Sequence, residues 1–190
     1  GTLRHDWFRT LLARDADVSL DTIDDEELAA VNWAVDYVRA TCSSEYPMEL
    51  ERAMTLADDK FETVMTGHFD AACGPDLYDL KWRPDNYDAQ LIAYALMRFQ
   101  ERDYPKIRIH VLFANIRQTR VFEITEAEAR AYVFGVLRSV AEVTTPIPST
   151  YCGWCSKRLT CPALLATVQR VASGYSLLDK VADWHPTDMQ

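Results

Sequence analysis

The stretch from residue 66 to residue 82 constrains the fold more than any other part of the chain. Two apolar segments flank Gly74-Pro75, a pair typical of tight turns, so the stretch predicts two strands joined by a turn. Asp70 falls at the end of the first strand, and Asp79 and Lys81 fall on the same face of the second. Aspartate and lysine are poor strand formers, so three charges beside a sheet indicate chemistry. The alternative is an exposed hairpin with a surface Asp–Lys pair.

The helical and strand patterns along the 190 residues predict an α/β domain. A helix between the third and fourth predicted strands implies a crossover, so we expect a mixed central sheet of about five strands flanked by helices. The core would span 1–145, a cysteine region with a last helix 146–174, and a tail 175–190. The predicted helices cover 1–14, with Leu3, Trp7, Leu11 and Leu12 at helical spacing, then from Thr22 or Asp24 to 41, from a cap at Asn86 or Asp88 to about 100, 126–143 and 162–173. Thr125 and Glu128 form a capping box at the start of the fourth of these helices. The predicted strands cover 48–56, 61–72, 77–82, 107–113 and 120–124.

Charge and hydropathy limit the class of protein. The hydrophobic content of 48% suits a globular fold, and no apolar run approaches the ~18 residues of a membrane helix. No signal peptide is evident, so we expect a cytoplasmic protein with no membrane partner. The net charge of −9 argues against a general electrostatic binder of nucleic acid, although it allows a nuclease with a local basic surface.

The charged hairpin suits a metal-dependent phosphodiester hydrolase. That reaction needs a hard cation, and Mg²⁺ is held by one or two carboxylates because it keeps several waters. Asp70 and Asp79 fit this need. Because two carboxylates surround it, we expect Lys81 to position the water and stabilise charge rather than act as a strict base. Glu51 could add a further acidic group, but an exposed strand carboxylate is the alternative we favour.

Three of the five cysteines lie close together near the C-terminus. Cys152, Cys155 and Cys161 form a compact set of thiols that could bind zinc or an iron–sulfur cluster, and their spacing does not choose between the two. Without secretion signals, this pattern predicts a reduced compartment and a metal site rather than disulfides. Cys73, beside the Gly74-Pro75 turn, is expected to be a small structural residue.

Five short motifs occur in an order that resembles a known superfamily. They are Gly1-Thr2-Leu3-Arg4-His5, Gly67-x-x-Asp70, Asp79-x-Lys81, Gln90-x-x-x-Tyr94, and the group of Cys152, Cys155 and Cys161. The set is similar to the PD-(D/E)XK nucleases, and more narrowly to the RecB-like exonuclease branch. The cysteine group resembles that of AddB-type and CRISPR-associated RecB-like nucleases.

The resemblance implies a restriction-endonuclease-like core and a role for each matched residue. Asp70, Asp79, the Leu80 carbonyl and His5 would bind Mg²⁺ or Mn²⁺, and Lys81 would be the catalytic lysine. Gln90 and Tyr94, one helical turn apart, would contact the scissile strand or brace the site. His5 as a helix residue with a satisfied hydrogen bond, and Tyr94 as plain core packing, are the alternatives.

The resemblance also favours a [4Fe-4S] cluster, with Zn²⁺ as the alternative. The matching cysteines are Cys152, Cys155 and Cys161, and a fourth ligand is needed. In the resembled proteins that ligand precedes the Gly-Thr-x-x-His motif. Here Cys42 is the best remaining candidate.

The implied function is DNA hydrolysis by an exonuclease in recombination, repair or the processing of phage or defence DNA, in the host cytoplasm if the protein is phage-encoded. Single- or double-stranded DNA is the expected partner, with a homo-oligomer or a partner protein possible. Basic residues that could hold phosphates are Arg98, Arg102, Lys157 and Arg158, with Lys106, Arg108, Arg117 and Arg120 nearby in the sequence. Scattered solvated charges are the alternative. The competing function is a non-catalytic nuclease-fold module with a structural metal.

Overall fold

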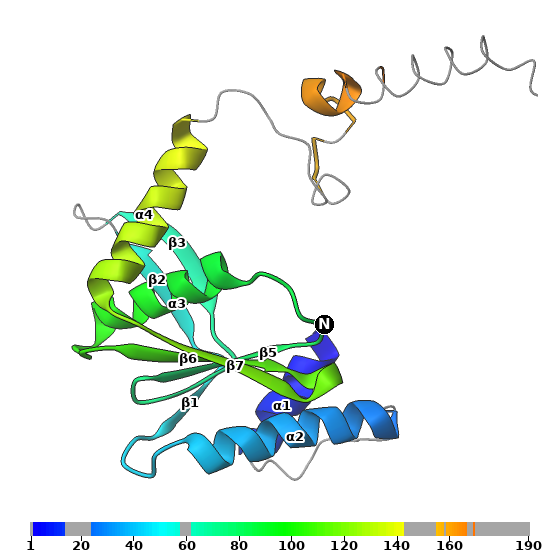
Figure 1. Ribbon diagram of the computed structural model, residues 1–190, viewed down its shortest axis with the longest axis vertical. Coiled ribbons are helices and arrows are strands. Elements are labelled where there is room, and N and C mark those ends of the chain that lie inside the picture. Colours follow the sequence, from blue (N-terminus) through cyan, green and yellow to red (C-terminus); the bar gives the residue numbers. More distant parts are fainter. Residues whose placement is uncertain are drawn as a thin grey trace, which may run out of the picture. The chain divides into compact units, whose positions relative to one another are not determined.

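The computed structural model describes residues 2–13, 24–57, 62–142, 155–157, 159–166 and 169. Figure 1 shows the arrangement of the first compact unit, Gly1–Leu137, in which helices cover both faces of a central sheet. The second unit is Arg138–Gln190. The predicted α/β class with a mixed sheet of five strands is confirmed.

The sheet has the order β1-β4-β5-β6-β7. Its strands are β1 (Met48–Leu50), β4 (Ala71–Cys73), β5 (Asp76–Lys81), β6 (Ile107–Phe113) and β7 (Gln118–Ile124). Only β5 and β6 are parallel, and the other neighbours are antiparallel. The parallel pair is connected through α3 (Asp88–Glu101), which is the crossover that the sequence predicts.

The first two predicted strands are wrong as single elements. Each divides in two, so that β2 (Ala53–Ala57) and β3 (Thr63–His68) form a separate two-stranded sheet. The chain bends at Glu51, between β1 and β2, and again at Asp70, between β3 and β4. The two bends lie side by side, since the Glu51 N–H donates to the Asp70 carbonyl at 3.0 Å. Glu51 has a φ of +43°, a left-handed conformation that ends the extended run. Asp70 therefore lies at a bend between two sheets rather than at the end of a straight strand.

Two helices cover one face of the five-stranded sheet. They are α1 (Thr2–Ala13) and α2 (Asp25–Thr41). Asp24 is the N-terminal cap of α2, and its carboxylate accepts from the Glu26 N–H. In α1, Phe8 is fully buried and Leu3 is exposed, whereas the sequence spacing placed Leu3 on the apolar face. Tyr78, Leu80 and Leu112 of the sheet pack in this layer with buried residues of α1 and α2.

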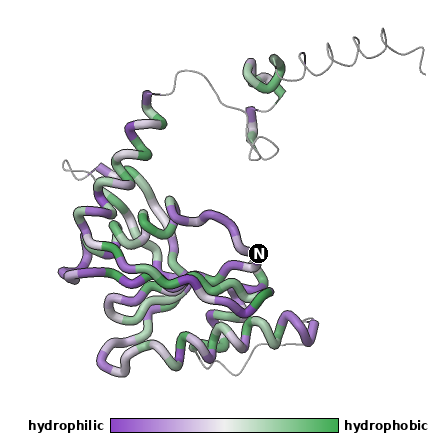
Figure 2. The backbone as a smooth tube through the Cα atoms, in the orientation of Figure 1, coloured by the Kyte–Doolittle hydropathy of each residue, from purple (hydrophilic) through white to green (hydrophobic). Residues whose placement is uncertain are grey.

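The other face carries the larger apolar cluster. It joins α3 to Leu77, Ile109, Val111 and Phe113 of the sheet, and it includes buried Met54 and Leu56 of the β2–β3 hairpin. Figure 2 shows the hydrophobic colouring along the central strands and α3. The helix α4 (Glu126–Glu142) contributes Ala129 and Val133. Its predicted capping box is confirmed, since Glu128 accepts from the Thr125 N–H at 2.9 Å.

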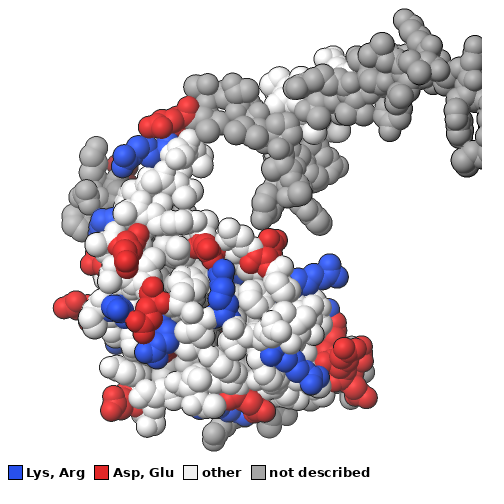
Figure 3. Space-filling model, viewed as in Figure 1, with Lys and Arg blue, Asp and Glu red and all other residues white. Residues whose placement is uncertain are grey.

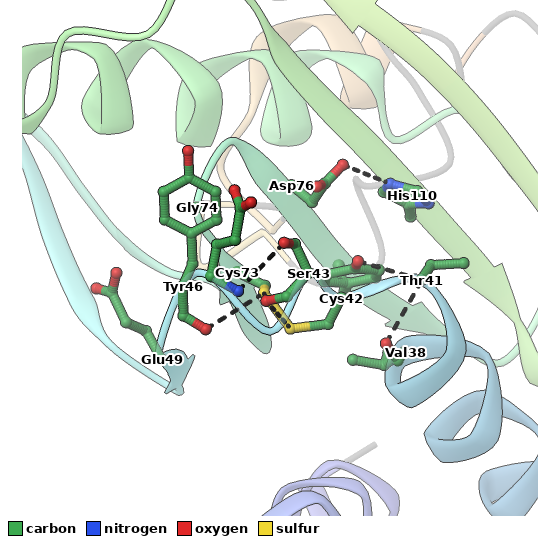
Figure 4. Close-up of a disulfide and its surroundings, with 12 residues drawn as sticks. Val38, Thr41, Cys42, Ser43, Tyr46, Glu49, Cys73, Gly74, Asp76 and His110 are labelled. Atoms are coloured by element: carbon green, nitrogen blue, oxygen red, sulfur yellow. Dashed lines mark hydrogen bonds and ion pairs between the residues drawn. A yellow bond between two sulfur atoms is a disulfide. The ribbon is translucent and has the colours of Figure 1, made fainter.

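A disulfide joins the helical layer to the sheet. Cys42 caps the C-terminal end of α2 and is bonded to Cys73 of β4, as Figure 4 shows. Next to it, Gly74 has a φ of +59°, and a Cβ there would lie 2.4 Å from Tyr46 Cδ2. The predicted Gly74-Pro75 turn therefore requires glycine for both conformation and space. The disulfide contradicts the expectation of cysteines without disulfides, and Cys73 is the structural residue that the sequence predicts.

The described residues of the second unit are few. They contain turns around Lys157 and Thr160 and a short helical segment over 162–166, where the Leu165 N–H donates to the Cys161 carbonyl at 3.0 Å. No helix in the described ranges is long and apolar enough to span a membrane.

Candidate active site

The site forms beside β5, at the level where β4 has ended. The pairing of β4 with β5 stops at Ala71 and Tyr78, so the next residues of β5 have no strand partner on that side. Side chains take the place of a strand there. Asp70 Oδ2 accepts the Leu80 N–H at 2.7 Å, and His5 Nε2 lies 3.0 Å from the Leu80 carbonyl oxygen. Residues from α1, the bend and β5 therefore meet at the backbone of Leu80.

Asp70 and Asp79 are a pair of poorly solvated carboxylates. Their side chains retain only 15% and 6% exposure. Burial, and then the charge of Asp79, raises the pKa of Asp70 to about 7, even though His5 and Lys81 act in the opposite direction. Burial also raises the pKa of Asp79, against the opposing charge of Lys81. Two carboxylates with raised pKa values beside each other indicate missing positive charge.

Lys81 supplies one positive charge but does not complete the site. Its Nζ lies 2.8 Å from Asp79 Oδ2 as an ion pair, yet this buried oxygen receives no hydrogen bond of good geometry. The strand alternation that the sequence predicts is confirmed, since Asp79 and Lys81 lie on the α3 side and Leu80 packs with α1 and α2. An oxygen that is buried and unsatisfied is where a further cation would be favourable.

Gln90 and Tyr94 hold the lysine from α3. Lys81 Nζ donates to Gln90 Oε1 at 3.0 Å, and Gln90 Nε2 donates to the Tyr94 hydroxyl at 2.7 Å. The Lys81 ammonium also lies 4.7 Å from the centre of the Tyr87 ring. Of the two predicted roles, bracing the site is the one that these contacts provide. Tyr94 packs against the apolar cluster as well, so its packing role is also present.

The glycine of the Gly-x-x-Asp motif has a steric explanation. Gly67 on β3 faces the Tyr94 ring, and a Cβ at this position would lie 2.4 Å from Tyr94 Cε1. Any larger residue would displace the tyrosine that Gln90 contacts. The motif thus links the β2–β3 hairpin to the chain of contacts that ends at Lys81.

The donor set fits a hard divalent cation. Within the described residues, no group of three or more His, Cys, Asp and Glu side chains is gathered closely enough to hold a metal ion. Mg²⁺ does not need such a group, because one or two carboxylates and a carbonyl are completed by water. Asp70, Asp79 and the Leu80 carbonyl provide that set. His5 adjoins it, 3.6 Å from Asp70 Oδ2, and its contact with Leu80 suits both predictions made for it.

Glu51 lies beside this group without joining it directly. Its backbone contacts Asp70, but its carboxylate lies 3.7 Å from Arg9 Nη1 on α1. Glu51 is 32% exposed in its side chain and lies between β1 and β2, so the favoured expectation of an exposed strand carboxylate is wrong in placing it on a strand and holds only in part for its exposure.

Arg98 is wrong as a candidate for binding nucleic acid. It is fully buried, and its two terminal nitrogens donate to the Glu49 carboxylate at 2.7 and 3.0 Å. Nη2 also donates to the Gly74 carbonyl. The helical spacing could not reveal this, because the partner lies 49 residues away on β1. The hydrogen bonds from Arg98 are the first cause that lowers the pKa of Glu49 to about 2.

The other basic candidates are dispersed. Arg102 is exposed but follows α3 at the end opposite Gln90, roughly 18 Å along the helix at 1.5 Å per residue. Lys157 is exposed in the second unit, and Arg158 lies outside the described residues. Figure 3 shows acidic and basic side chains interspersed over the face in view. The described surface offers no large area of basic charge on this face.

Cys42 is also wrong as a cluster ligand, because its sulfur is bonded to Cys73. Cys155 and Cys161 are free thiols, and Cys152 lies outside the described residues. No local pattern indicates the disulfide, since Cys42 and Cys73 are 31 residues apart in the chain.

A second buried polar group was not predicted. His110 of β6 lies with Nε2 3.1 Å from Asp76 Oδ1 and Nδ1 3.0 Å from the Tyr37 hydroxyl. It stacks on Tyr78, with ring centres 4.6 Å apart, and Figure 4 shows its contact with Asp76. Asp76 begins β5 whereas Lys81 ends it, so this group is separate from the candidate active site.

Comparison with known proteins finds no family model, curated protein or solved structure that matches this chain. The function is therefore inferred from the geometry of the site and from the motif resemblance.

Proposed function

We propose that this protein is a Mg²⁺- or Mn²⁺-dependent DNA nuclease of the PD-(D/E)XK type, acting as an exonuclease. The observation that carries the proposal is the buried pair of Asp70 and Asp79, whose pKa values are raised and beside which lies the Lys81 ammonium. Strongly perturbed carboxylates beside a positioned lysine are typical of a catalytic centre.

The residues divide the chemistry among them. Asp70, Asp79 and the Leu80 carbonyl would hold the cation, which when bound lowers the pKa of water and neutralises charge on the phosphate. Lys81, fixed by Gln90, would orient the attacking water and stabilise the charge that develops on the phosphate oxygens. Tyr94 fixes Gln90 in turn. No proton transfer to Lys81 is required.

The first experiment measures degradation of linear DNA with Mg²⁺ or Mn²⁺. Lys81→Ala should reduce the rate by about 10²–10⁴-fold while the circular dichroism spectrum and melting temperature are retained. Lys106→Ala is the matched control, because Lys106 is an exposed lysine paired with Glu123 at the opposite end of the sheet. Equal rates for wild type and Lys81→Ala would reject the catalytic assignment. Resistance of covalently closed circular DNA distinguishes an exonuclease from an endonuclease.

The alternative function is a non-catalytic module of the same fold. The net charge of −9 and the interspersed surface charges favour it, because they leave little general attraction for DNA. It predicts no degradation of single- or double-stranded DNA with either metal. Digestion by the wild type that Asp79→Asn removes would exclude it.

A [4Fe-4S] cluster, or zinc in its place, remains part of the proposal through Cys152, Cys155 and Cys161. The disulfide of Cys42 means that a fourth ligand must be another group. Anaerobically purified protein should be brown, with iron and sulfide present and lost in Cys155→Ser. A colourless protein with bound zinc would establish the alternative.

A further inference from the structure

We propose that Arg120 and Phe122 on β7 form a subsite for a phosphate of the DNA strand, beside the phosphate that is cleaved. This inference rests on the proposed nuclease function. It is carried by the register of the sheet, which sets Asp79 of β5, Val111 of β6 and Arg120 of β7 in one row. Side chains in such a row lie on the same face, so Arg120 is on the face of Asp79 and Lys81.

The separation suits a neighbouring phosphate on the same strand. Adjacent strands are about 4.8 Å apart, which places the backbone of Arg120 roughly 10 Å from that of Asp79. The long arginine side chain can cover part of this distance. A phosphate held there would be near the one beside Asp79 and Lys81 without competing for the same oxygens.

A cavity marks the position. It has a volume of about 260 Å³ and is lined by Asp88, Arg120 and Phe122. The Arg120 side chain is 40% exposed, its guanidinium carbon lies 5.2 Å from the Phe122 ring centre, and its Nε is buried without a hydrogen-bond partner. A partly exposed guanidinium next to an aromatic ring can present its donors to a phosphate once Asp88 releases it.

The cavity is connected to the catalytic lysine through α3. Arg120 forms an ion pair with Asp88 in the first turn of α3, and Gln90 two residues later accepts from Lys81. In the DNA-free protein, Asp88 thus holds the arginine in place, and a phosphate must compete with this carboxylate. The subsite and the catalytic centre are therefore positioned by the same helical turn.

Four other basic side chains of this unit, all considered as phosphate ligands from the sequence, are less suited. Arg98 is buried against Glu49, and Arg102 lies beyond the far end of α3. Lys106 and Arg108 are paired with Glu123, and Arg108 also contacts Asp76 at the start of β5. Arg120 is 40% exposed, has an Nε without a hydrogen-bond partner, and lies in the same row of the sheet as Asp79.

The test measures binding of a fluorescein-labelled single-stranded oligonucleotide, and of its duplex, by the Lys81→Ala protein over a range of salt concentrations. Adding Arg120→Ala should weaken binding roughly tenfold and reduce the slope of log K against log salt by about one. Arg120→Lys should restore the slope but only part of the affinity, because it keeps the charge without the fork. Asp88→Asn should strengthen binding several-fold by removing the competing carboxylate.

Arg130→Ala is the matched control. Arg130 is 43% exposed, pairs with Glu126 and lies 5.9 Å from the Phe134 ring, so it resembles Arg120 in exposure, ion pairing and ring contact but lies on α4 instead of the sheet. It should change neither affinity nor salt slope. The same pair of variants in the active protein should show a raised KM for Arg120→Ala alone.

The outcomes separate the two proposals. If the wild type degrades DNA but Arg120→Ala and Arg130→Ala behave alike, the subsite is rejected and the nuclease remains. If DNA is bound with the expected dependence on Arg120 but is never degraded, the subsite stands and the catalytic function is rejected. If DNA is neither bound nor degraded, both are rejected.

Discussion

Two clusters of buried charge on this domain differ in whether positive charge matches their carboxylates. The Glu49 carboxylate joins β1 to α3 and receives a bidentate contact from Arg98 and a further hydrogen bond of 2.6 Å from Arg52, although Arg98 Nε is itself buried without a partner. The Asp70 and Asp79 cluster has two acids for one ammonium. The difference teaches that burial alone is a weak sign of a functional site, and that a buried excess of one charge is a stronger sign.

The pKa values express the same contrast. Hydrogen bonds from Arg98 lower the pKa of Glu49 to about 2, whereas burial raises the pKa of Asp70 to about 7. The first cluster therefore stabilises the fold, and the second lowers its stability while both carboxylates are ionised.

The strongest test of the contrast replaces one acid in each cluster in the absence of metal. Glu49→Gln should destabilise the protein by about 3–5 kcal/mol, because it leaves the Arg98 charge buried without a counter-charge. Asp79→Asn should be neutral or stabilising, since it removes one of two repelling acids. Urea denaturation in EDTA measures both. A loss of stability of similar size in the two variants would contradict the comparison.

Divalent metal should act on one cluster only. Mg²⁺ or Mn²⁺ at a hundred times its dissociation constant should stabilise the wild type by about 2.7 kcal/mol, as expected for a ligand that binds only the folded state. Asp79→Asn should lose most of this gain, and Glu123→Gln, which alters an exposed carboxylate, should keep it. Calorimetric melting with and without metal gives the comparison. Equal metal-induced shifts in both variants would place the cation elsewhere.

The free energy of unfolding should rise with pH on the acid side of its maximum and fall with pH on the other side. Since the pKa of Glu49 is lowered from 4.5, its stabilisation is present above that value and is lost as the pH falls toward about 2. Since the pKa of Asp70 is raised from 3.8, the metal-free protein should lose on the order of 1–3 kcal/mol as the pH rises from about 4 through 7.

Urea denaturation over this pH range, in EDTA, would measure the two slopes. Asp70→Asn should flatten the loss above pH 5, and Glu49→Gln should flatten the loss at acid pH. Unchanged slopes in either variant would show that another group is responsible.

The smallest change is expected from Gly67→Ala, which tests how far the site depends on its supporting contacts. The new methyl group must displace the Tyr94 ring, at a cost of about 1 kcal/mol since the ring is only partly buried. Because Gln90 would lose its Tyr94 partner, the rate of DNA cleavage should fall further than stability does. Gly135→Ala, on an open part of α4, is the control. Full activity in Gly67→Ala would show that Tyr94 does not position Lys81.

The parts of the fold that the sequence predicted correctly depend on local patterns. The alternation around Asp79 placed it on the same face as Lys81, and the capping box of Thr125 and Glu128 located the start of α4. The spacing of Gln90 and Tyr94 correctly placed them on one face of a helix. Each of these predictions needs only the geometry of a single element and its neighbours in the chain.

The features that the sequence did not reveal depend on distant partners. The burial of Arg98 follows from Glu49, and the oxidation of Cys42 follows from its closeness to Cys73. The bend at Asp70 depends on the left-handed backbone of Glu51, for which a glutamate gives no signal. Charge alone made Arg98 and Arg120 look alike, although one is internal and the other faces a cavity.

The short turn at Gly74 has a consequence for the order in which the site assembles. It pairs Ala71 with Tyr78, so the two acids that flank this pair are brought together by a hairpin closed over a few residues. The contact of His5 with Leu80 spans 75 residues and requires α1 to dock. Contacts between residues close in the sequence cost less chain entropy than contacts between distant ones. Undocking of α1 would therefore remove His5 while the hairpin keeps Asp70 and Asp79 in register, so the two acids can be assembled without the helix that brings the histidine.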